Sequence, residues 1–117
     1  MSLRAPIAVT VEVRGQTRDG PRRAFRLAAS IGDDGLRLER PAPFELGRQV
    51  EVRFTMPDGG TPLRLFAEVR PAPDDDGDDE AAARGGRELG FLSADEDDRR
   101  VLRLYVTDRL GLPDLMS

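Results

Sequence analysis

Residues 50–70 read VEVRFTMPDGGTPLRLFAEVR, and this stretch decides the fold class. Apolar side chains occupy every second position on either side of a Pro-Asp-Gly-Gly turn: Val50, Val52, Phe54 and Met56 before it, and Leu63, Leu65, Ala67 and Val69 after it. A period of two is typical of a strand with one buried face, and the turn residues favour a tight reversal. The stretch therefore predicts an antiparallel β-hairpin. Phe66 interrupts its polar face, so we expect part of that face to be covered.

The same period continues along most of the chain. It predicts four further strands, at about 7–13, 25–29, 36–39 and 88–92. In the second of these, Phe25, Leu27 and Ala29 form the apolar face that we expect to be buried.

A single helical pattern follows the last strand. Ser93 and Glu96 match the S-x-x-E capping box, and Gly111 with Pro113 supplies a stop signal. Between them the spacing predicts a helix over 94–110 with one apolar stripe, formed by Val101, Leu102, Leu104 and Tyr105. We therefore expect an all-β fold in a single domain, residues 1–117. It is a six-stranded antiparallel barrel with one C-terminal amphipathic helix that caps the barrel or meets a partner.

Between the last two strands lies an acidic insert, residues 71–86. Its acidic residues repel one another and bury little apolar area, which predicts a flexible loop: Asp74, Asp75, Asp76, Asp78, Asp79 and Glu80. A calcium loop of the EF-hand type is the alternative. It fails in register, because placing Gly77 at position 6 puts Ala72 at position 1 and Ala83 at position 12.

The composition excludes several classes of chemistry. The chain has no His, Cys or Lys, and all 18 of its cations are arginine, for a net charge of −4. It therefore lacks the residues for a Cys/His zinc site, a disulfide, a thiol nucleophile or a Schiff base. We expect no enzymatic activity, no resident metal or cofactor and no nucleic-acid polymer as partner. No apolar run is long enough to span a membrane, and we expect a cytoplasmic protein.

One pair of arginines is a candidate ligand site. Arg22 and Arg26 lie four residues apart, so on a strand they project from one face, opposite to Phe25 and Leu27. Guanidinium groups bind phosphates and the guanine edge, so such a pair could hold a guanine nucleotide. The alternative, which we favour, is a solvated strand face in an arginine-rich chain.

The ordered set of motifs resembles the PilZ domain family. Residues 4–13 look like the first strand of that family, and Ser30–Leu38 resembles its D/N-x-S-x-x-G turn and following strand. Leu46–Gly59 resembles its L-x-x-G-x-x-V-x-L-x-L-P-D-G hairpin, and the segment from Leu89 through Leu102 completes the pattern.

This resemblance implies a bacterial signalling module with cyclic di-GMP as its ligand. In the family, an R-x-x-x-R segment before the first strand and the D/N-x-S-x-x-G turn close over the dinucleotide. The matching positions here are Arg4, Ser30, Gly32 and Gly35. Ser30 stands where Asp or Asn is expected, and Gly32 replaces the family's serine. Arg4 is the one arginine before the first strand, unless native residues precede Met1 and carry another.

The Arg22/Arg26 pair belongs to the second strand and does not match the family's arginines in register. The resemblance thus leaves two functions open. One is a non-enzymatic receptor that binds cyclic di-GMP weakly or conditionally and acts through a protein partner. The other is a degenerate barrel that binds no nucleotide and serves only as a protein adaptor.

Overall fold

The computed structural model describes residues 3–57, 59, 60, 62–71 and 86–111. The described residues form six strands and one helix: β1 (Ala5–Thr17), β2 (Gly20–Ile31), β3 (Gly35–Leu38), β4 (Gln49–Phe54), β5 (Leu63–Arg70), β6 (Glu88–Ser93) and α2 (Glu96–Leu110). The strands pair antiparallel in the order β1-β2-β3-β6-β5-β4 and close into a barrel. This confirms the predicted fold class. Most of the acidic insert, residues 72–85, lies outside the described residues.

The strands β4 and β5 form the hairpin that the sequence predicts. Val50 pairs with Ala67 and Val52 with Leu65, and all four side chains lie in the barrel core. Their neighbours along each strand point outward to solvent. Phe66 is among them and remains 48% exposed, so the described residues do not cover it as expected.

The predicted orientation of β2 is wrong. Phe25 and Leu27 face outward, with 55% and 39% of their surface exposed, whereas Ala24 and Ala28 face the core. The hairpin turn explains this orientation. Thr17 pairs with Gly20 across a two-residue turn, which fixes the register so that Ala24 lies opposite the buried Val13. Residues directly opposite in an antiparallel pair share a face, so the register overrides the apolar pattern of the strand.

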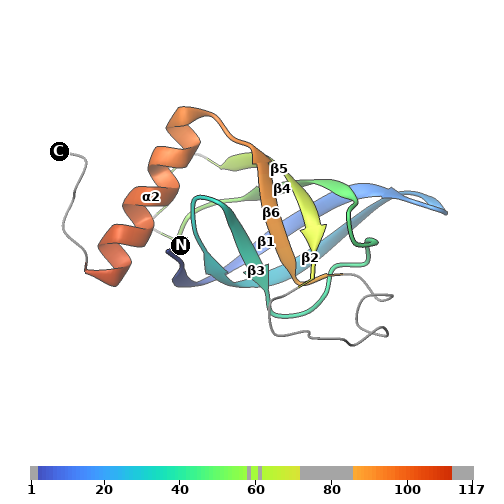
Figure 1. Ribbon diagram of the computed structural model, residues 1–117, viewed down its shortest axis with the longest axis horizontal. Helices are drawn as coiled ribbons and strands as arrows, with labels where there is room; N and C mark the ends of the chain where they lie inside the picture. The colour runs from blue at the N-terminus through green and yellow to red at the C-terminus, as the bar shows by residue number, and fades with distance from the viewer. Residues whose placement is uncertain (1–2, 58, 61, 72–85, 112–117) are drawn as a thin grey trace.

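The helix α2 lies against one end of the barrel, where it packs near the start of β1 (Figure 1). Leu102 is fully buried in the barrel core, and the Tyr105 hydroxyl donates a 3.0 Å hydrogen bond to the Pro6 carbonyl oxygen. Of the predicted apolar stripe, Val101 and Leu104 are instead exposed, and the second buried side chain of the helix is Val106.

The ends of the helix agree only partly with the sequence. Gly111 adopts the left-handed conformation (φ 68°) as the predicted stop residue. The capping box is wrong: Ser93 still belongs to β6, and the N-cap residue is Asp95, with no side-chain cap hydrogen bond. Three acidic residues in the first turn, Glu96, Asp97 and Asp98, complement the helix dipole.

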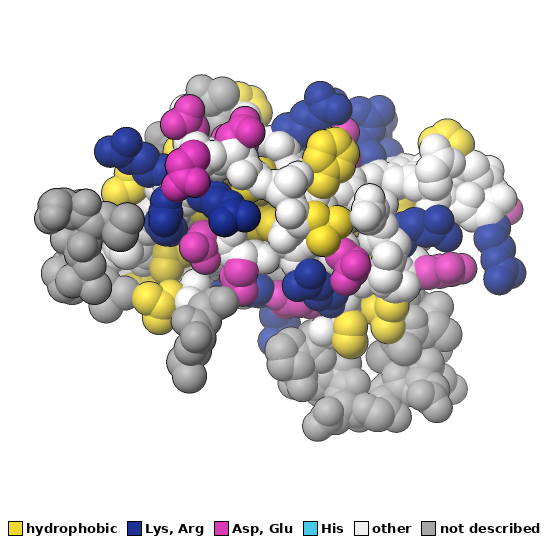
Figure 2. Space-filling model, turned by 45° about the horizontal axis from the view of Figure 1, so that its top comes forward, with side chains coloured by type: hydrophobic (Ala, Val, Ile, Leu, Met, Phe, Trp, Pro, Cys, Tyr) yellow, Lys and Arg dark blue, Asp and Glu magenta, His cyan; other side chains and the backbone are white. Residues whose placement is uncertain are grey.

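The β1–β2 hairpin extends beyond the barrel. β1 pairs with β2 as far as Thr17 and Gly20, but with β4 only from Glu12 to Arg14. The tip of the hairpin therefore projects from the barrel end opposite to α2 (Figure 1). Figure 2 shows that arginine and acidic side chains intermingle over the visible face of the molecule.

The packing of α2 predicts a contrast between two leucines of the same helix. Leu102→Ala should lower the free energy of unfolding by about 2–5 kcal/mol, because the substitution leaves a cavity in the core. Leu104→Ala should change it by no more than about 0.5 kcal/mol, since that side chain is 50% exposed. Urea unfolding of both variants measures the difference. Equal losses would contradict the described orientation of the helix.

Candidate functional site

The structure brings together the start of β1 and the turn between β2 and β3. Ala5 pairs with Ile31 and Pro6 with Ser30, so Arg4, the residue before β1, lies directly beside this turn. The Gly32 N–H closes the turn by donating a 2.9 Å hydrogen bond to the Gly35 carbonyl oxygen. The four positions singled out from the sequence, Arg4, Ser30, Gly32 and Gly35, therefore lie in one region of the surface.

Other parts of the chain lie so close to Gly32 and Gly35 that neither position has room for a Cβ atom. A Cβ atom on Gly32 would lie 2.5 Å from the Leu3 carbonyl oxygen and 3.4 Å from Arg4 Cδ. A Cβ atom on Gly35 would collide with the Leu89 carbonyl oxygen and lie 3.1 Å from Arg4 Nη2. Leu3 and Arg4 thus occupy the space that a side chain at position 32 would need, which accounts physically for glycine in place of serine there.

Two carboxylates hold the Arg4 side chain. Arg4 Nη2 forms an ion pair with Glu88 Oε1, and Arg4 Nε lies 3.3 Å from Asp34 Oδ1. The Arg4 side chain is 25% exposed. Its partial burial works to lower the pKa of Arg4, but hydrogen bonds to Glu88 and Asp34 and their negative charges outweigh the burial and raise the pKa above its ordinary value. Arg4 is therefore charged at any physiological pH.

Sequence reasoning missed these two acidic partners. Asp34 stands inside the turn, so its nearness to Arg4 follows once β1 and β2 are paired in register. Glu88 comes from β6, and it reaches Arg4 because β3 pairs with β6, with Arg37 opposite Glu88 and Gly35 opposite Gly90. No local pattern in the sequence marks a contact between positions so far apart.

Ser30 occupies a half-buried position in the middle of the sheet. It pairs with Pro6 of β1 on one side and with Arg37 of β3 on the other. Within the described part of the chain, its hydroxyl makes no side-chain hydrogen bond and keeps its capacity to donate and accept.

The Arg22/Arg26 pair lies elsewhere. Both residues belong to β2, as predicted. Arg22 pairs with Gly15 near the tip of the hairpin. Arg26 donates from Nε to the Pro41 carbonyl oxygen at 3.0 Å and from Nη1 to the Phe25 carbonyl oxygen at 2.9 Å. The two guanidinium groups therefore do not form a common site with Arg4.

Two further features of the described residues bear on function. They contain no group of three or more His, Cys, Asp or Glu side chains that could hold a metal ion. Within the same ranges, no helix has the length and apolar character needed to cross a membrane. The calcium alternative for the acidic insert lies outside them.

The chain is thus a small closed six-stranded barrel in which Arg4 contacts the β2–β3 turn, and this is the kind of domain to compare with known families. The family model described as PilZ domain matches residues 2–108, and the chain belongs to this family. PilZ domains are generally signalling modules that bind cyclic di-GMP.

Two solved structures have a similar fold. One is the Bacillus subtilis inhibitor of motility MotI/DgrA, with a TM-score of 0.68 and 14% identity over 95% of this chain and 51% of that one. The present chain thus spans about half of that protein. The other is the PilZ domain of CeSA from a cellulose-synthesizing bacterium, with a TM-score of 0.55 and 19% identity over 92% of this chain and 95% of that one. At these identities both likenesses show the fold alone. A comparison with curated proteins finds no match.

The close approach at Gly32 makes a testable prediction about the turn. Gly32→Ser restores the family's residue but forces its Cβ against the Leu3 carbonyl oxygen, so it should destabilise the fold by about 1–3 kcal/mol. Ser30→Ala, at a half-buried position with no such contact, should cost less. Thermal unfolding of the two variants provides the comparison. A Gly32→Ser variant as stable as the parent would show that the Leu3 segment does not pack there.

Proposed function

We propose that this PilZ domain is a non-enzymatic signalling module of the bacterial cytoplasm that binds cyclic di-GMP weakly or conditionally. Its ligand site would consist of Arg4 and the turn positions Ser30, Gly32 and Gly35, and it would act through a protein partner. The observation that carries the proposal is the position of the Arg4 guanidinium across the turn that the family uses for this ligand.

The chemistry of the ligand suits such a site. Cyclic di-GMP carries two phosphates and two guanine bases. A guanidinium group binds a phosphate or the O6/N7 edge of guanine through two parallel hydrogen bonds. The Ser30 hydroxyl supplies a further donor or acceptor beside the turn.

The ion pairs of Arg4 give a physical reason for weak binding. A phosphate must displace Glu88 and Asp34 from the guanidinium, and both carboxylates remain close enough to repel it. The phosphate can contact the Arg4 guanidinium only after the ion pairs of Arg4 with Glu88 and Asp34 have been broken. A partner protein that supplies a cation to these acids would draw them away from Arg4 and strengthen the binding of cyclic di-GMP. Binding is conditional in this sense.

The second candidate is a barrel that binds no nucleotide and serves only as a protein adaptor. The same ion pairs favour it, because they give Arg4 a complete structural role in joining β1, the turn and β6. The two candidates differ in one measurable property, the affinity for cyclic di-GMP.

Calorimetric titration with cyclic di-GMP tests the assignment of Arg4. Arg4→Ala should weaken binding by about 1.5–3 kcal/mol, or roughly tenfold or more, because it removes a charge-assisted contact. The Arg22→Ala/Arg26→Ala double variant is the control and should have a much smaller effect. Loss of binding in the control alone would refute the proposed site, and no binding by the parent at millimolar ligand would favour the adaptor.

The role of the two carboxylates leads to a prediction with the opposite sign. Glu88→Gln and Asp34→Asn keep the shape of each side chain but remove its charge, so each should release Arg4 for the ligand. Exposed ion pairs contribute about 0.2–1 kcal/mol, which predicts an increase in affinity of up to about fivefold for Asp34→Asn. The Glu88 side chain is only 12% exposed, so Glu88→Gln should have at least as large an effect. The same titration measures it, with Glu68→Gln as the matched control on β5. Weaker binding in both variants would mean that the acids belong to the ligand site and do not compete with it.

A further inference from the structure

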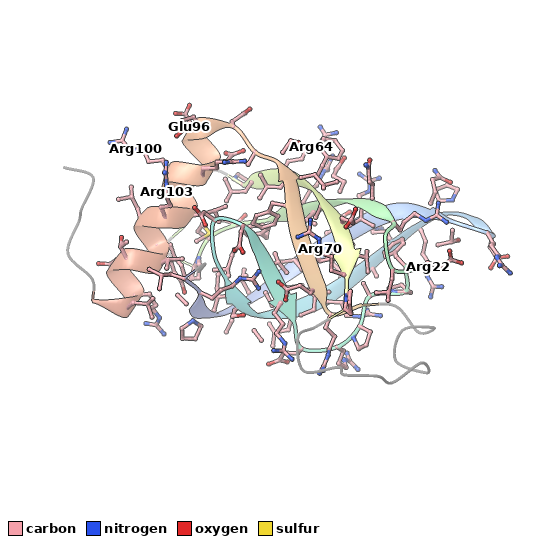
Figure 3. The ribbon with its side chains drawn as sticks, in the orientation of Figure 1. Arg22, Arg64, Arg70, Glu96, Arg100 and Arg103 are labelled. Atoms are coloured by element: carbon pink, nitrogen blue, oxygen red, sulfur yellow. The ribbon has the colours of Figure 1, made fainter. Side chains whose placement is uncertain are left out.

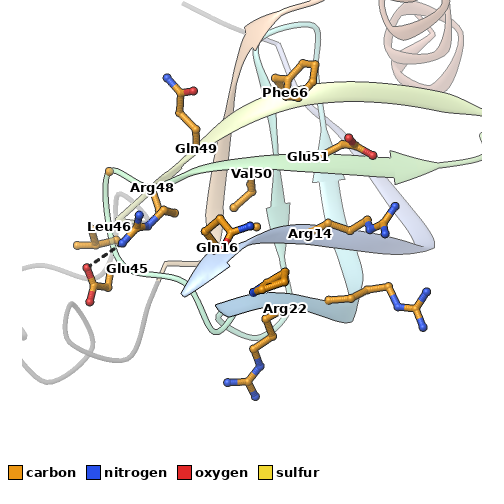
Figure 4. A pocket seen from close by; sticks show the side chains of 14 residues that line it. Arg14, Gln16, Arg22, Glu45, Leu46, Arg48, Gln49, Val50, Glu51 and Phe66 are labelled. Atoms are coloured by element: carbon orange, nitrogen blue, oxygen red, sulfur yellow. Dashed lines mark ion pairs between the residues drawn. The ribbon is translucent and has the colours of Figure 1, made fainter. Parts of the chain in front are cut away.

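The far end of the β1–β2 hairpin carries a second polar surface, which the proposed ligand site does not use. An open groove of about 980 Å³ lies between the hairpin and the segment that leads into β4 (Figure 4). Gly15 forms part of its floor, where a Cβ atom would lie 2.9 Å from Val50. Arg14 follows Arg4 by ten positions, a distance of about 33 Å along an extended strand. The groove is thus remote from the site at Arg4.

Four arginines line the groove: Arg14, Arg22 and Arg23 from the hairpin, and Arg48 from the segment before β4. We call all four the hairpin arginines. Their charges are only partly compensated. Arg14 and Arg23 share a single carboxylate, Glu12, at 3.6 and 3.8 Å.

Arg48 lies 3.6 Å from Glu45. Among the described residues, no carboxylate lies within ion-pair distance of Arg22.

The remaining acid of the groove adds little negative charge. Glu51 lies 2.6 Å from Arg53 and 3.0 Å from Arg64, two arginines outside the groove. Burial works to raise the pKa of Glu51, but hydrogen bonds from Arg53 and Arg64 and their charges lower it overall. The carboxylate is therefore ionised and already neutralised, so the hairpin arginines leave the groove with an excess of positive charge.

The apolar side chain of Phe66 also lines the groove. The register places Arg23 opposite Arg14, Arg14 opposite Glu51, and Glu51 opposite Phe66, all on the outer face. With strands about 4.8 Å apart, this row extends for roughly 14 Å and ends at the half-exposed Phe66 ring. A ligand that follows the row meets cationic groups first and an aromatic side chain at its end.

We propose that the groove binds an extended acidic segment of a partner protein, with one apolar side chain of that segment on Phe66. Charge complementarity selects an anion. In Figure 4 the labelled Arg14, Arg22 and Arg48 side chains point in different directions, so they suit several separated carboxylates better than one compact phosphate. Glu45, which lines the groove beside Arg48, would repel a continuous phosphate chain, whereas a peptide can leave a neutral residue beside it. The inference rests on the partner-dependent part of the proposed function and is independent of cyclic di-GMP binding.

Fluorescence anisotropy with a labelled synthetic peptide tests this inference. The probe is a short peptide of Asp and Glu with one Leu. A peptide with Asn and Gln in place of the acids and an oligothymidylate of equal length serve for comparison. The acidic peptide should bind best, and raising the salt concentration should weaken it because screening reduces the attraction.

Charge reversal then locates the site. Arg14→Glu/Arg23→Glu, at the two arginines of the outer row, should weaken peptide binding about tenfold or more, as charge pairs across an interface do. The matched control is Arg99→Glu/Arg100→Glu on α2, at the opposite end of the molecule, where Figure 3 labels Arg100; it should bind like the parent. Phe66→Ser should weaken the Leu-containing peptide without reducing the melting temperature, since the ring is half exposed.

The outcomes separate this inference from the proposed function. Loss of peptide binding in the Arg14→Glu/Arg23→Glu variant, with its affinity for cyclic di-GMP equal to that of the parent, supports the groove. Equal loss in the α2 control, tighter binding of the oligothymidylate, or no binding of the acidic peptide at millimolar concentration would each overturn it, whatever the result with cyclic di-GMP.

Discussion

The pairing of β1 with two neighbours is the constraint on which the rest of the structure depends. β1 joins β2 along nearly its whole length, and its short contact with β4 closes the barrel. A closed sheet leaves no exposed edge within the barrel, and its inner face becomes one core. Because β1 extends past its contact with β4, the same strand brings Arg4 to the β2–β3 turn at one end and, paired with β2, forms the projecting hairpin at the other.

The sequence predicts the barrel well where the apolar period and the turns agree. The hairpin at 50–70 is the clearest example, since its alternation and its Pro-Asp-Gly-Gly turn favour the same register. β2 shows the limit. Its larger apolar residues, Phe25 and Leu27, point outward because the two-residue turn before Gly20 sets the pairing with β1. The helix start shows a similar conflict, since Ser93 completes β6 and is not available as an N-cap.

Only the residues of the candidate site that belong to the family's motifs could be predicted from the sequence. The resemblance indicated Arg4, Ser30, Gly32 and Gly35, and strand pairing brings them together. It gave no indication of Glu88, which reaches Arg4 through the pairing of β3 with β6. Nor could a motif show that the Leu3 carbonyl oxygen fills the space beside Gly32. Both features come from packing between distant segments, and the second accounts for glycine in place of the family's serine at position 32.

The central claim is that the Arg4 guanidinium exchanges its carboxylate partners for cyclic di-GMP. Proton–nitrogen NMR of the labelled protein observes this exchange directly, through the Arg4 side-chain Nε–H signal and the amide signals of Gly32 and Gly35. The account predicts that titration with cyclic di-GMP shifts these signals together, with the amides of the hairpin tip unchanged. Signals that stay in place up to millimolar ligand, or shifts centred on Arg22 to Arg26, would contradict it.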